Sequence, residues 1–377
     1  MALKVMAIFG TRPEAIKLAP VIDELRKRDG IETRVVITAQ HREMIDQVLK
    51  IFGIRPDVDL DIMRPNQTLD DIVCRSMAGI APVFEATRPD VVLIQGDTTS
   101  AVAMALAANH RGITVGHVEA GLRTYDKTQP FPEELNRQLI GRLADLHFAP
   151  TDTAHDNLLR EGAPNDRVFM TGNTVVDALL RVLAEIREPS NQALSPINFD
   201  NKKVILVTAH RRESFGAPLQ NIAAAVRQIA AENDDVEIVL PVHPNPRVSE
   251  VIRPALENVP RVRLVGPLDY PDLIWVLSRC YFAMTDSGGI QEEAPTFKKP
   301  VLVMRDKTER PEGIEAGVAK IVGTTIYRLV GAATDLLTDD AVYSSMRAKK
   351  NPYGDGRAAV RIVDCLLTSL SDVAART

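Results

Sequence analysis

Cysteine is scarce in this sequence, and the few residues that occur lie far apart. The 377 residues include only Cys74, Cys280 and Cys365. Their odd number and wide separation argue against a disulfide framework, and the absence of any CxxC or Cys/His spacing argues against a metal site. We therefore expect reduced thiols in a cytoplasmic protein that holds no metal.

Long apolar runs and an excess of basic residues are also missing. No run reaches the roughly 18–20 apolar residues that span a membrane, and the first residues enter a strand-like segment instead of the apolar region of a signal peptide. Lys and Arg number 45 against 50 Asp and Glu, whereas a nucleic-acid surface needs a basic excess. We expect a cytoplasmic protein with no membrane or nucleic-acid partner, although local cations can still bind a small anion.

The fingerprints of two common nucleotide sites are absent as well. No GxGxxG follows a predicted strand, and no GxxxxGK(S/T) occurs in the chain. Both patterns bring glycine backbone against phosphates, in dinucleotide and ATP sites respectively. The sequence therefore disfavours nicotinamide and ATP chemistry, and we expect no cofactor.

What the sequence does contain is a regular alternation of short apolar runs with helical patterns. Continuous runs rich in Val and Ile indicate strands buried on both faces, as in parallel α/β sheets. A chain of this length is expected to form two domains. Strands are predicted at residues 5–9, 34–38, 91–94, 114–118, 146–148 and 167–170, then at 204–207, 236–240, 262–265, 281–284, 301–304 and 320–322, with helices such as 15–27, 44–51 and 219–231 between them.

These two sets of strands predict the fold class and the place to look for a site. A polar, proline-containing stretch at about residues 187–202 separates the sets. We predict an α/β protein made of two doubly wound, Rossmann-like domains that face each other across a cleft. Ligands bind such sheets at the carboxyl ends of the strands, so the residues that follow each strand are the candidates.

The first predicted strand runs into a segment that suits anion binding. Thr11 and Glu14 have capping-box spacing, and Pro13 suits a first helical turn. Free N–H groups at a helix N-terminus, with Arg12 and Lys17 nearby, would bind a phosphate. A plain helix cap with two solvated cations is the structural alternative.

Three acidic residues follow strands of the first half. Asp97 and Glu119 end consecutive strands, and Glu133 follows the loop after the second of them. An acid at the end of a buried strand is costly unless it is capped, paired or functional. Asp97 could instead cap the helix near Ser100, and Glu133 could be an ordinary acid in a first helical turn. Together the three carboxylates suit general acid–base chemistry.

The second half offers cations and a glycine-rich turn. His210 ends a strand beside Arg211 and Arg212, which favours a place near phosphate, whereas His243 lies between prolines and is at least as well explained as structural. Ser287-Gly288-Gly289, between a strand and a helix, lets backbone N–H groups approach a pyrophosphate. Glu293, further along that helix, could accept both ribose hydroxyls. This pattern predicts a nucleoside-diphosphate site.

A set of longer strings extends this interpretation across the chain from Leu3 to about Leu367. They are Gly10-Thr11-Arg12-Pro13-Glu14-Ala15-Ile16-Lys17, Thr38-Ala39-Gln40-His41-Arg42, Gln95-Gly96-Asp97-Thr98-Thr99, His117-Val118-Glu119-Ala120-Gly121-Leu122-Arg123-Thr124, Gly172-Asn173-Thr174-Val175, His210-Arg211-Arg212-Glu213-Ser214, Asp286-Ser287-Gly288-Gly289-Ile290-Gln291-Glu292-Glu293-Ala294-Pro295 and Asn351-Pro352-Tyr353-Gly354-Asp355-Gly356. In this order they resemble the motifs of the non-hydrolysing UDP-N-acetylglucosamine 2-epimerase family, bacterial type.

The resemblance implies an architecture and a reaction. The architecture is glycosyltransferase-B, with an N-terminal domain at residues 1–172, completed by a C-terminal helix at 358–377, and a UDP-binding domain at 173–357. The reaction is the reversible conversion of UDP-GlcNAc to UDP-ManNAc, by elimination of UDP to 2-acetamidoglucal and re-addition. It needs no cofactor and would supply ManNAc for cell-surface polysaccharide.

The resemblance also assigns roles to individual residues. The family's acid–base residues match Asp97, Glu119 and Glu133, and we count His210 with them as catalytic. Contacts to the UDP-sugar match Arg12, Lys17, Asp97, Glu119, His210, Ser287, Gly288, Gly289, Glu293 and Arg310.

Many bacterial members bind a second UDP-GlcNAc as an allosteric activator, and the family implies a homodimer. Residues at the activator site match Gln40, His41, Glu43, Glu133, Arg211 and His243. The chain lacks an arginine that some members carry near residues 66–68, so activation is less strongly implied than catalysis.

Other functions stay open at this level. A glycosyltransferase of the same architecture would bind the nucleotide alike, a hydrolysing epimerase would release free ManNAc, and a relative could act on a UDP-diacetamido uronic acid. A non-catalytic nucleotide-sugar sensor fits least, because none of the acidic positions is missing.

Overall fold

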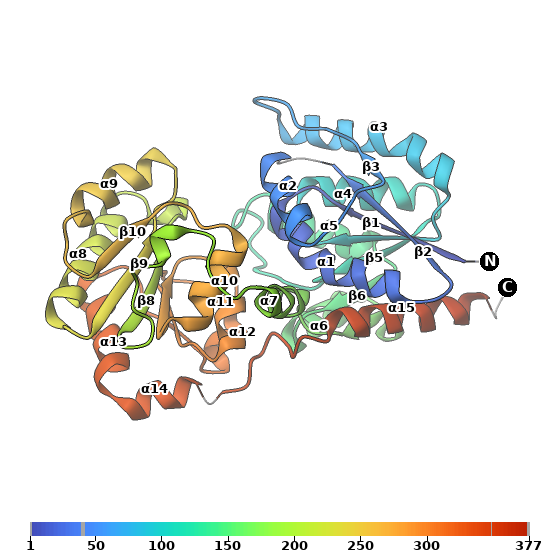
Figure 1. The fold of residues 1–377 in the computed structure, drawn as a ribbon. Coiled ribbons are helices and arrows are strands. Elements are labelled where there is room, and N and C mark those ends of the chain that lie inside the picture. The colour runs from blue at the N-terminus through green and yellow to red at the C-terminus, as the bar shows by residue number, and fades with distance from the viewer. Residues whose placement is uncertain (1, 39–41, 348, 375–377) are drawn as a thin grey trace. The chain divides into compact units, whose positions relative to one another are not determined.

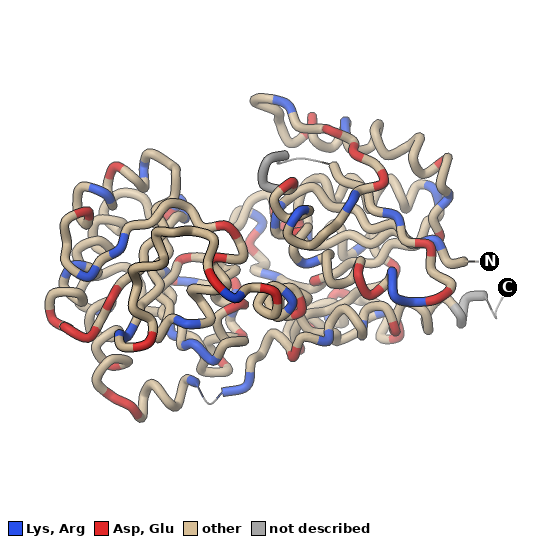
Figure 2. The backbone as a smooth tube through the Cα atoms, viewed as in Figure 1, with Lys and Arg blue, Asp and Glu red and all other residues tan. Residues whose placement is uncertain are grey.

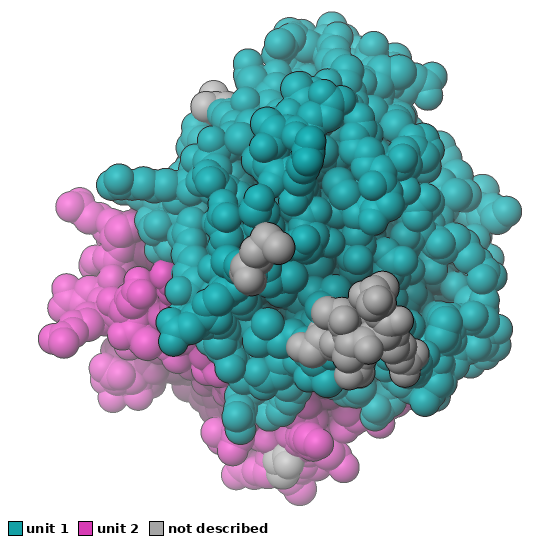
Figure 3. Space-filling model, turned by 90° about the vertical axis from the view of Figure 1, so that its right-hand side faces the viewer, with its two compact units in different colours: residues 1–178, 353–377 teal, residues 179–352 magenta. Residues whose placement is uncertain are grey.

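The chain divides into two compact units. The computed structural model describes residues 2–38, 42–347 and 349–374, and the side chains at 42–44 and 371–374 lie outside that description. Unit 1 comprises Met1–Ala178 and Tyr353–Thr377, and unit 2 comprises Leu179–Pro352 (Figure 3). Each unit has a parallel sheet of its own with helices on both faces (Figure 1).

Unit 1 is built on a parallel sheet with the order β3-β2-β1-β4-β5-β6-β7 in the part of the chain that the structure describes. Its strands are β1 (Leu3–Phe9), β2 (Ile31–Ile37), β3 (Val58–Asp59), β4 (Val91–Gln95), β5 (Thr114–Val118), β6 (Leu146–Ala149) and β7 (Val168–Met170). Its helices are α1 (Arg12–Lys27), α2 (Arg42–Ile51), α3 (Leu69–Thr87), α4 (Thr99–Asn109), α5 (Glu133–Leu143), α6 (Asp152–Arg160), most of α7 (Thr174–Glu185) and α15 (Ala358–Ala374).

The sheet of unit 2 has the order β10-β9-β8-β11-β12-β13, again within the described residues. Its strands are β8 (Lys203–Thr208), β9 (Val236–Pro241), β10 (Val262–Val265), β11 (Phe282–Thr285), β12 (Val301–Val303) and β13 (Ala319–Ile321). Its helices are α8 (Ala217–Glu232), α9 (Pro246–Leu256), α10 (Tyr270–Arg279), α11 (Gly288–Glu293), α12 (Pro311–Glu315), α13 (Ile326–Thr338) and α14 (Asp340–Arg347).

The predicted fold class is confirmed. Every strand predicted from an apolar run is present, and α1, α2 and α8 occupy the three predicted helical segments. The short strand β3 was not predicted, because two residues make no periodic pattern. Helix α1 begins at Arg12, three residues before the predicted start, because Thr11 and Glu14 form the capping box that organises its first turn.

Both sheets reverse their strand order once, and this reversal positions the candidate site. The reversal lies between β1 and β4 in unit 1 and between β8 and β11 in unit 2. At such a switch point the two following loops turn to opposite sides of the sheet and leave a crevice at the carboxyl ends of the strands. The motifs after β1, β4, β8 and β11 therefore lie where a doubly wound sheet binds its ligands.

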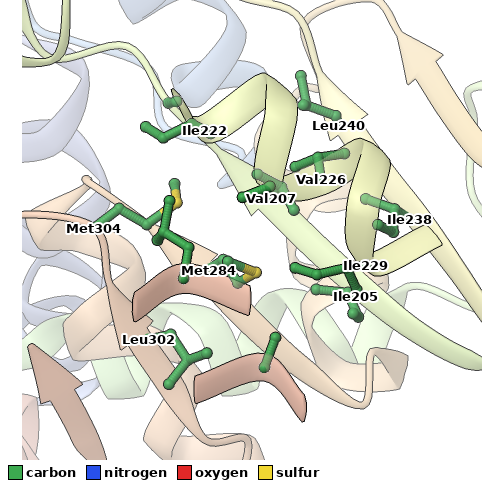
Figure 4. Close-up of a cluster of buried hydrophobic side chains, with 14 of the residues drawn as sticks. Ile205, Val207, Ile222, Val226, Ile229, Ile238, Leu240, Met284, Leu302 and Met304 are labelled. Carbon is green, nitrogen blue, oxygen red and sulfur yellow. The ribbon is translucent and has the colours of Figure 1, made fainter. Parts of the chain in front are cut away.

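The apolar pattern that predicted the strands also accounts for the core of unit 2. Figure 4 shows Ile205 and Val207 of β8 beneath Ile222, Val226 and Ile229 of α8. The helical residues recur at intervals of four and three, which places them on one face. All five are at most 1% exposed, and burying each side chain contributes about 1.5–3 kcal/mol.

The last helix belongs to unit 1. The carboxylate of Asp177 accepts hydrogen bonds from the backbone N–H groups of Ala358 and Ala359 at 3.2 and 2.9 Å and so caps α15. Further along, Asp364 pairs with Arg28 at the end of α1 (2.8 Å). These contacts explain why the C-terminal segment is part of unit 1 despite its position in the sequence.

Charged residues of both signs occur throughout the part of the chain that the structure describes. Lys and Arg are interspersed with Asp and Glu along both units (Figure 2). No helix within the described residues is both long and apolar enough to cross a bilayer.

Candidate functional site

The turn from β1 into α1 is organised by one buried carboxylate. Glu14 is 3% exposed, and its Oε2 accepts hydrogen bonds from the backbone N–H groups of Gly10 and Thr11, both at 2.7 Å. Its Oε1 accepts one from the hydroxyl of Thr98, the N-cap of α4 (2.5 Å). Burial raises the pKa of Glu14 although these bonds act against it. The predicted capping box is confirmed, and it also ties together the two loops at the switch point of unit 1.

Glu119 follows β5 in a backbone conformation that few residues other than glycine adopt, with φ of 64°. Its carboxylate is held by Lys17 of α1, whose Nζ lies 2.7 and 2.6 Å from the two oxygens. Gln95, the last residue of β4, donates a further hydrogen bond to Oε2. Backbone and side chain of Glu119 are therefore both held in place, and the residue is only 7% exposed.

Asp97 does not cap a helix. The residue that caps α4 is Thr98, whose hydroxyl accepts from the backbone N–H of Ala101. The carboxylate of Asp97 pairs with Arg137 of α5 through Nε and Nη2, at 2.8 and 2.7 Å. Arg137 also contacts the buried Glu134 at 3.2 Å. The structural alternative for Asp97 is thereby ruled out.

Glu133 is the first residue of α5, so it is an acid in a first helical turn. Its Oε2 is buried and has no hydrogen-bond partner among the described residues. One turn later Asn136 donates to the backbone carbonyl of Asp97 at 2.8 Å. The start of α5 thus lies beside the β4–α4 loop, at the same edge of the sheet as Asp97 and Glu119.

In unit 2, the loop that follows β8 is bound to the end of β11. The carboxylate of Asp286 accepts hydrogen bonds from the backbone N–H groups of His210 and Arg211 at 2.8 and 2.9 Å. Nδ1 of His210 lies 3.2 Å from the other oxygen of Asp286. The imidazole of His243 stacks on that of His210 with ring centroids 5.7 Å apart. The two predicted histidines are therefore neighbours.

The glycine-rich turn lies where the sequence predicts. Ser287 is the N-cap of α11, and Gly288 and Gly289 are its first two residues. A Cβ on Gly288 would lie 3.3 Å from Glu309 and 3.6 to 3.7 Å from the guanidinium groups of Arg211 and Arg310. Glycine at this position leaves the backbone N–H groups accessible beside two cations, which suits a diphosphate.

The cations beside this turn are already paired with carboxylates. Arg310 donates to Glu292, and Glu309 lies 2.7 Å from Arg305 and 3.7 Å from Arg211. Burial acts against ionisation of Glu309, but Arg310 and Arg305 outweigh it and hold its pKa at about 2. Glu293, the residue predicted to bind ribose, is 6% exposed in the last turn of α11.

The residues predicted to bind an activator are only partly described. Gln40 and His41 lie outside the described residues, and Glu43 lies in α2, where only the backbone is described. In unit 2, Arg211 follows His210 and donates its backbone N–H to Asp286, and the ring of His243 stacks on that of His210. Glu133 belongs to unit 1.

Four residues at the site were not singled out from the sequence. Gln95 and Arg137 hold the candidate acids, and Asp286 and Glu309 hold the candidate cations. Gln95 and Asp286 begin strings that were recognised, so position alone could have marked them. For Arg137 no local signal exists, because its partner lies 40 residues earlier.

Comparisons with known proteins find similarity to UDP-N-acetylglucosamine 2-epimerases in both sequence and structure. A sequence profile of UDP-N-acetylglucosamine 2-epimerase matches residues 23–367. UDP-N-acetylglucosamine 2-epimerase of Yersinia pestis is 51% identical over 97% of this chain and 98% of its own length. The crystal structure of UDP-GlcNAc 2-epimerase from Neisseria meningitidis bound to UDP-GlcNAc is 46% identical, with a TM-score of 0.91 over 97% of this chain and 100% of that one.

A more distant structure is similar in fold alone. The glycotransferase of kitacinnamycin is 16% identical, with a TM-score of 0.64 over 97% of this chain and 99% of that one. The predicted glycosyltransferase-B type of architecture is therefore confirmed.

Proposed function

Because the chain belongs to the UDP-N-acetylglucosamine 2-epimerase family, we propose that it interconverts UDP-GlcNAc and UDP-ManNAc by inversion at C2 of the sugar. The observation that carries this proposal is the pair of restrained carboxylates at neighbouring strand ends. Glu119 is held by Lys17, and Asp97 by Arg137. Carboxylates that are fixed in place at the end of a strand are suited to exchange a proton with a bound substrate.

The chemistry explains why acids and cations are both needed. C2–H is not adjacent to a carbonyl, so a carboxylate cannot remove its proton unaided. Cleavage of the C1–O bond, with the electron pair leaving on UDP, gives C1 cationic character and acidifies C2–H. One carboxylate then takes the proton, which leaves 2-acetamidoglucal and UDP.

Return to the sugar nucleotide reverses both steps, but only the proton is delivered to the other face of the ring. UDP re-adds to C1, and an acid delivers a proton to C2 from the side opposite to the first. Two carboxyl groups are therefore required, and the three candidates are Asp97, Glu119 and Glu133. Of these, Glu133 has a buried oxygen without a hydrogen-bond partner among the described residues.

The departing UDP requires positive charge and hydrogen-bond donors. We assign this task to the UDP-binding residues predicted from the sequence, and His210 acts among them on the diphosphate. Support comes from the position of Gly288 beside Arg211 and Arg310, since guanidinium groups and backbone N–H groups bind phosphate strongly. The assigned residues are Arg12, Lys17, His210, Ser287, Gly288, Gly289 and Arg310, while Glu293 accepts hydrogen bonds from the ribose hydroxyls.

Three further parts of the proposal concern the setting of the reaction. A second UDP-GlcNAc acts as an activator through Gln40, His41, Glu43, Glu133, Arg211 and His243. The enzyme is a homodimer. It supplies ManNAc for surface polysaccharide. It works in the cytoplasm, a reducing compartment in which its three cysteines would stay free thiols.

One incubation tests the proposal against its rivals. The protein is supplied with UDP-GlcNAc alone in D₂O, and the products are resolved by chromatography and NMR. We expect a mixture of UDP-GlcNAc and UDP-ManNAc that carries deuterium at C2. Free ManNAc would indicate a hydrolysing enzyme, and no reaction until an acceptor is added would indicate a transferase. Product that keeps its original hydrogen at C2 would rule out removal of that proton by carboxylates that exchange protons with the solvent.

A further inference from the structure

The ion pair between Arg137 and Asp97 uses only one oxygen of the carboxylate. Nε of Arg137 donates to Oδ2 of Asp97 at 2.8 Å, and Nη2 lies 2.7 Å from the same oxygen. Oδ1 accepts no hydrogen bond from any residue that the structure describes. The Asp97 side chain is 25% exposed, whereas that of Arg137 is 8% exposed. Oδ1 is therefore the oxygen that stays available to a ligand.

Arg137 is anchored on its other side by a second carboxylate. Its Nη1 donates to Oε2 of Glu134 at 3.2 Å, and the Glu134 side chain is fully buried. Glu134 also accepts hydrogen bonds from the backbone N–H groups of Thr124 and Tyr125, at 2.9 and 3.1 Å, and from the side chain of Gln138 at 3.0 Å. Burial acts against ionisation, but these donors and Arg137 outweigh it and lower the pKa of Glu134. The guanidinium group is thus fixed in direction by an anion that is itself fixed.

The backbone that carries Asp97 is held as well. Asn136 donates from its amide to the backbone carbonyl of Asp97 at 2.8 Å. Nε2 of the buried His117 lies 2.7 Å from the backbone carbonyl of Gly96. Helix α5 and strand β5 therefore fix the two peptide units at the start of the loop, and Arg137 fixes Oδ2. With both ends of the residue fixed, the direction of Oδ1 is determined.

We propose that Arg137 is a positioning residue for the reaction, which holds Asp97 by Oδ2 so that Oδ1 faces C2 of the sugar and exchanges the proton there. This rests on the proposed function, which brings the sugar to Asp97. A guanidinium group does not deprotonate in proteins, so Arg137 keeps its charge and its contacts throughout and passes no proton itself.

The proton exchange balances in both directions. When Oδ1 takes the proton from C2, the electron pair of the C2–H bond forms the C1–C2 double bond of the glycal, and the pair of the C1–O bond leaves with UDP. When Oδ1 gives a proton to C2, the pair of the double bond forms the new C2–H bond, and a UDP oxygen supplies the pair of the new C1–O bond.

The decisive variant is Arg137→Lys. It keeps the positive charge, but a single ammonium group cannot replace a rigid fork that contacts Asp97 and Glu134 together. Loss of the fixed direction should lower kcat by a factor on the order of 10², as for other small misplacements of a reacting group. UDP affinity in calorimetry should be unchanged, because the described contacts of Arg137 include no residue assigned to the diphosphate. Turnover close to that of the unmodified protein would overturn the proposal.

Arg142→Lys is the matched control, because it makes the same exchange at an exposed position of the same helix. We expect it to keep the turnover of the unmodified protein. A double variant separates positioning from other effects, with residual turnover measured as deuterium uptake at C2 over long incubations. If Arg137 acts through Asp97, then Asp97→Asn combined with Arg137→Lys is no slower than Asp97→Asn alone. A further loss in the double variant would overturn the proposal.

The contact can also be measured without substrate. In protein labelled with ¹⁵N-arginine, the Nε–H signal of Arg137 is identified by its absence in Arg137→Lys. We expect this hydrogen to exchange slowly with water in the unmodified protein and faster in Asp97→Ala, which removes its acceptor. Equal exchange rates in the two proteins would overturn the proposal. Because no substrate is present, this outcome is distinct from a failure of epimerase activity.

A crystal structure with UDP-GlcNAc tests the direction of the carboxylate. We expect Oδ1 of Asp97 to be the oxygen nearer to C2, with Arg137 still on Oδ2. Oδ2 as the nearer oxygen would overturn the proposal. An Asp97 that lies away from the sugar altogether would contradict the proposed function itself, and the role of Arg137 with it.

Discussion

The ammonium group of Lys17 contacts both carboxylate oxygens of Glu119, at 2.7 and 2.6 Å, and so joins the second turn of α1 to the end of β5. The two side chains are 12% and 4% exposed. An ion pair so well shielded from water is sensitive to the loss of either partner. It links the stability of unit 1 to the charge of a candidate catalytic residue.

Removing the cation should therefore destabilise unit 1. Lys17→Met removes the ammonium group that contacts both oxygens of the buried Glu119 carboxylate, and we expect the free energy of unfolding to fall by about 3 kcal/mol. Urea unfolding should be followed by far-UV circular dichroism, because the single tryptophan, Trp275, lies in unit 2. Lys27→Met is the matched control. Its side chain is 70% exposed and pairs with Glu24, so it should change stability by less than about 0.5 kcal/mol.

The double variant Lys17→Met with Glu119→Gln tests whether the buried charge of Glu119 causes the loss of stability in Lys17→Met. A neutral amide in place of the carboxylate removes the buried charge that has lost its cation, so most of the lost stability should return. Should the double variant be as unstable as Lys17→Met, packing of the lysine side chain would be the cause instead.

Glu119→Gln alone should separate catalysis from binding. The amide keeps the shape of the carboxylate but cannot accept a proton from C2, and we expect turnover to fall by a factor on the order of 10²–10⁴. Affinity for UDP, measured by calorimetry, should be retained, because the binding residues of unit 2 are unchanged. Glu32→Gln, at a half-exposed position paired with Arg34, should leave turnover unaltered. Near-normal turnover in folded Glu119→Gln would remove this residue from the mechanism.

Gly121→Ala should disturb the loop that carries Glu119. Gly121 has φ of 90°, and an added Cβ would lie 2.1 Å from the backbone oxygen of Ala154. The clash is with main chain, so α6 has to shift, and we expect a loss of about 2–3 kcal/mol in unfolding free energy. Gly53→Ala is the control, with φ of 61° and no atom within 4 Å of the added Cβ. It carries only the conformational cost of about 1–2 kcal/mol. Equal effects of the two substitutions would contradict the steric argument.

Two buried histidines of adjacent strands should make unit 1 sensitive to acid. Burial lowers the pKa of His117 to about 3 and that of His147 to about 4. Since the unfolded chain takes up these protons near pH 6.5, it binds more protons than the folded protein below that pH. The contribution of these two histidines to the free energy of unfolding is therefore fully present above pH 6.5. It is lost progressively as the pH is lowered toward 3–4.

At pH 5 the loss should amount to roughly 2 kcal/mol for each histidine. The urea midpoint followed by far-UV circular dichroism at pH 7, 6 and 5 measures it. His147→Gln should make the midpoint less dependent on pH, whereas His110→Gln, at an exposed position, should leave the dependence as it is. A midpoint that does not move between pH 7 and 5 would contradict the prediction.

The elements of the fold were predictable because their signals are local. Strand β4 consists of four consecutive apolar residues followed by Gln95. The capping-box residues Thr11 and Glu14 predict the start of α1 from a segment of four residues. The two-residue strand β3 carries no such signal and was missed. Its pairing with β2 is decided by the rest of the sheet.

The sequence predicted most residues of the candidate site, but few of the contacts between them. Asp97 looked as much like a helix cap as a catalytic acid until its partner, Arg137, was seen. Similarly, nothing near His210 in the sequence points to Asp286, which lies 76 residues further along the chain. Pairs of this kind arise only when strands distant in sequence become neighbours in a sheet.

By itself, the sequence determined which segments form strands and helices, since apolar periodicity and capping residues act over a few positions. It also determined which residue types stand at the strand ends. The tertiary structure alone decided how those residues are held: Glu119 by Lys17 and Gln95, Asp97 by Arg137, and His210 by Asp286. The physical reason is that the charge state and orientation of a buried polar group depend on partners and solvent exclusion, and these exist only after the chain has folded.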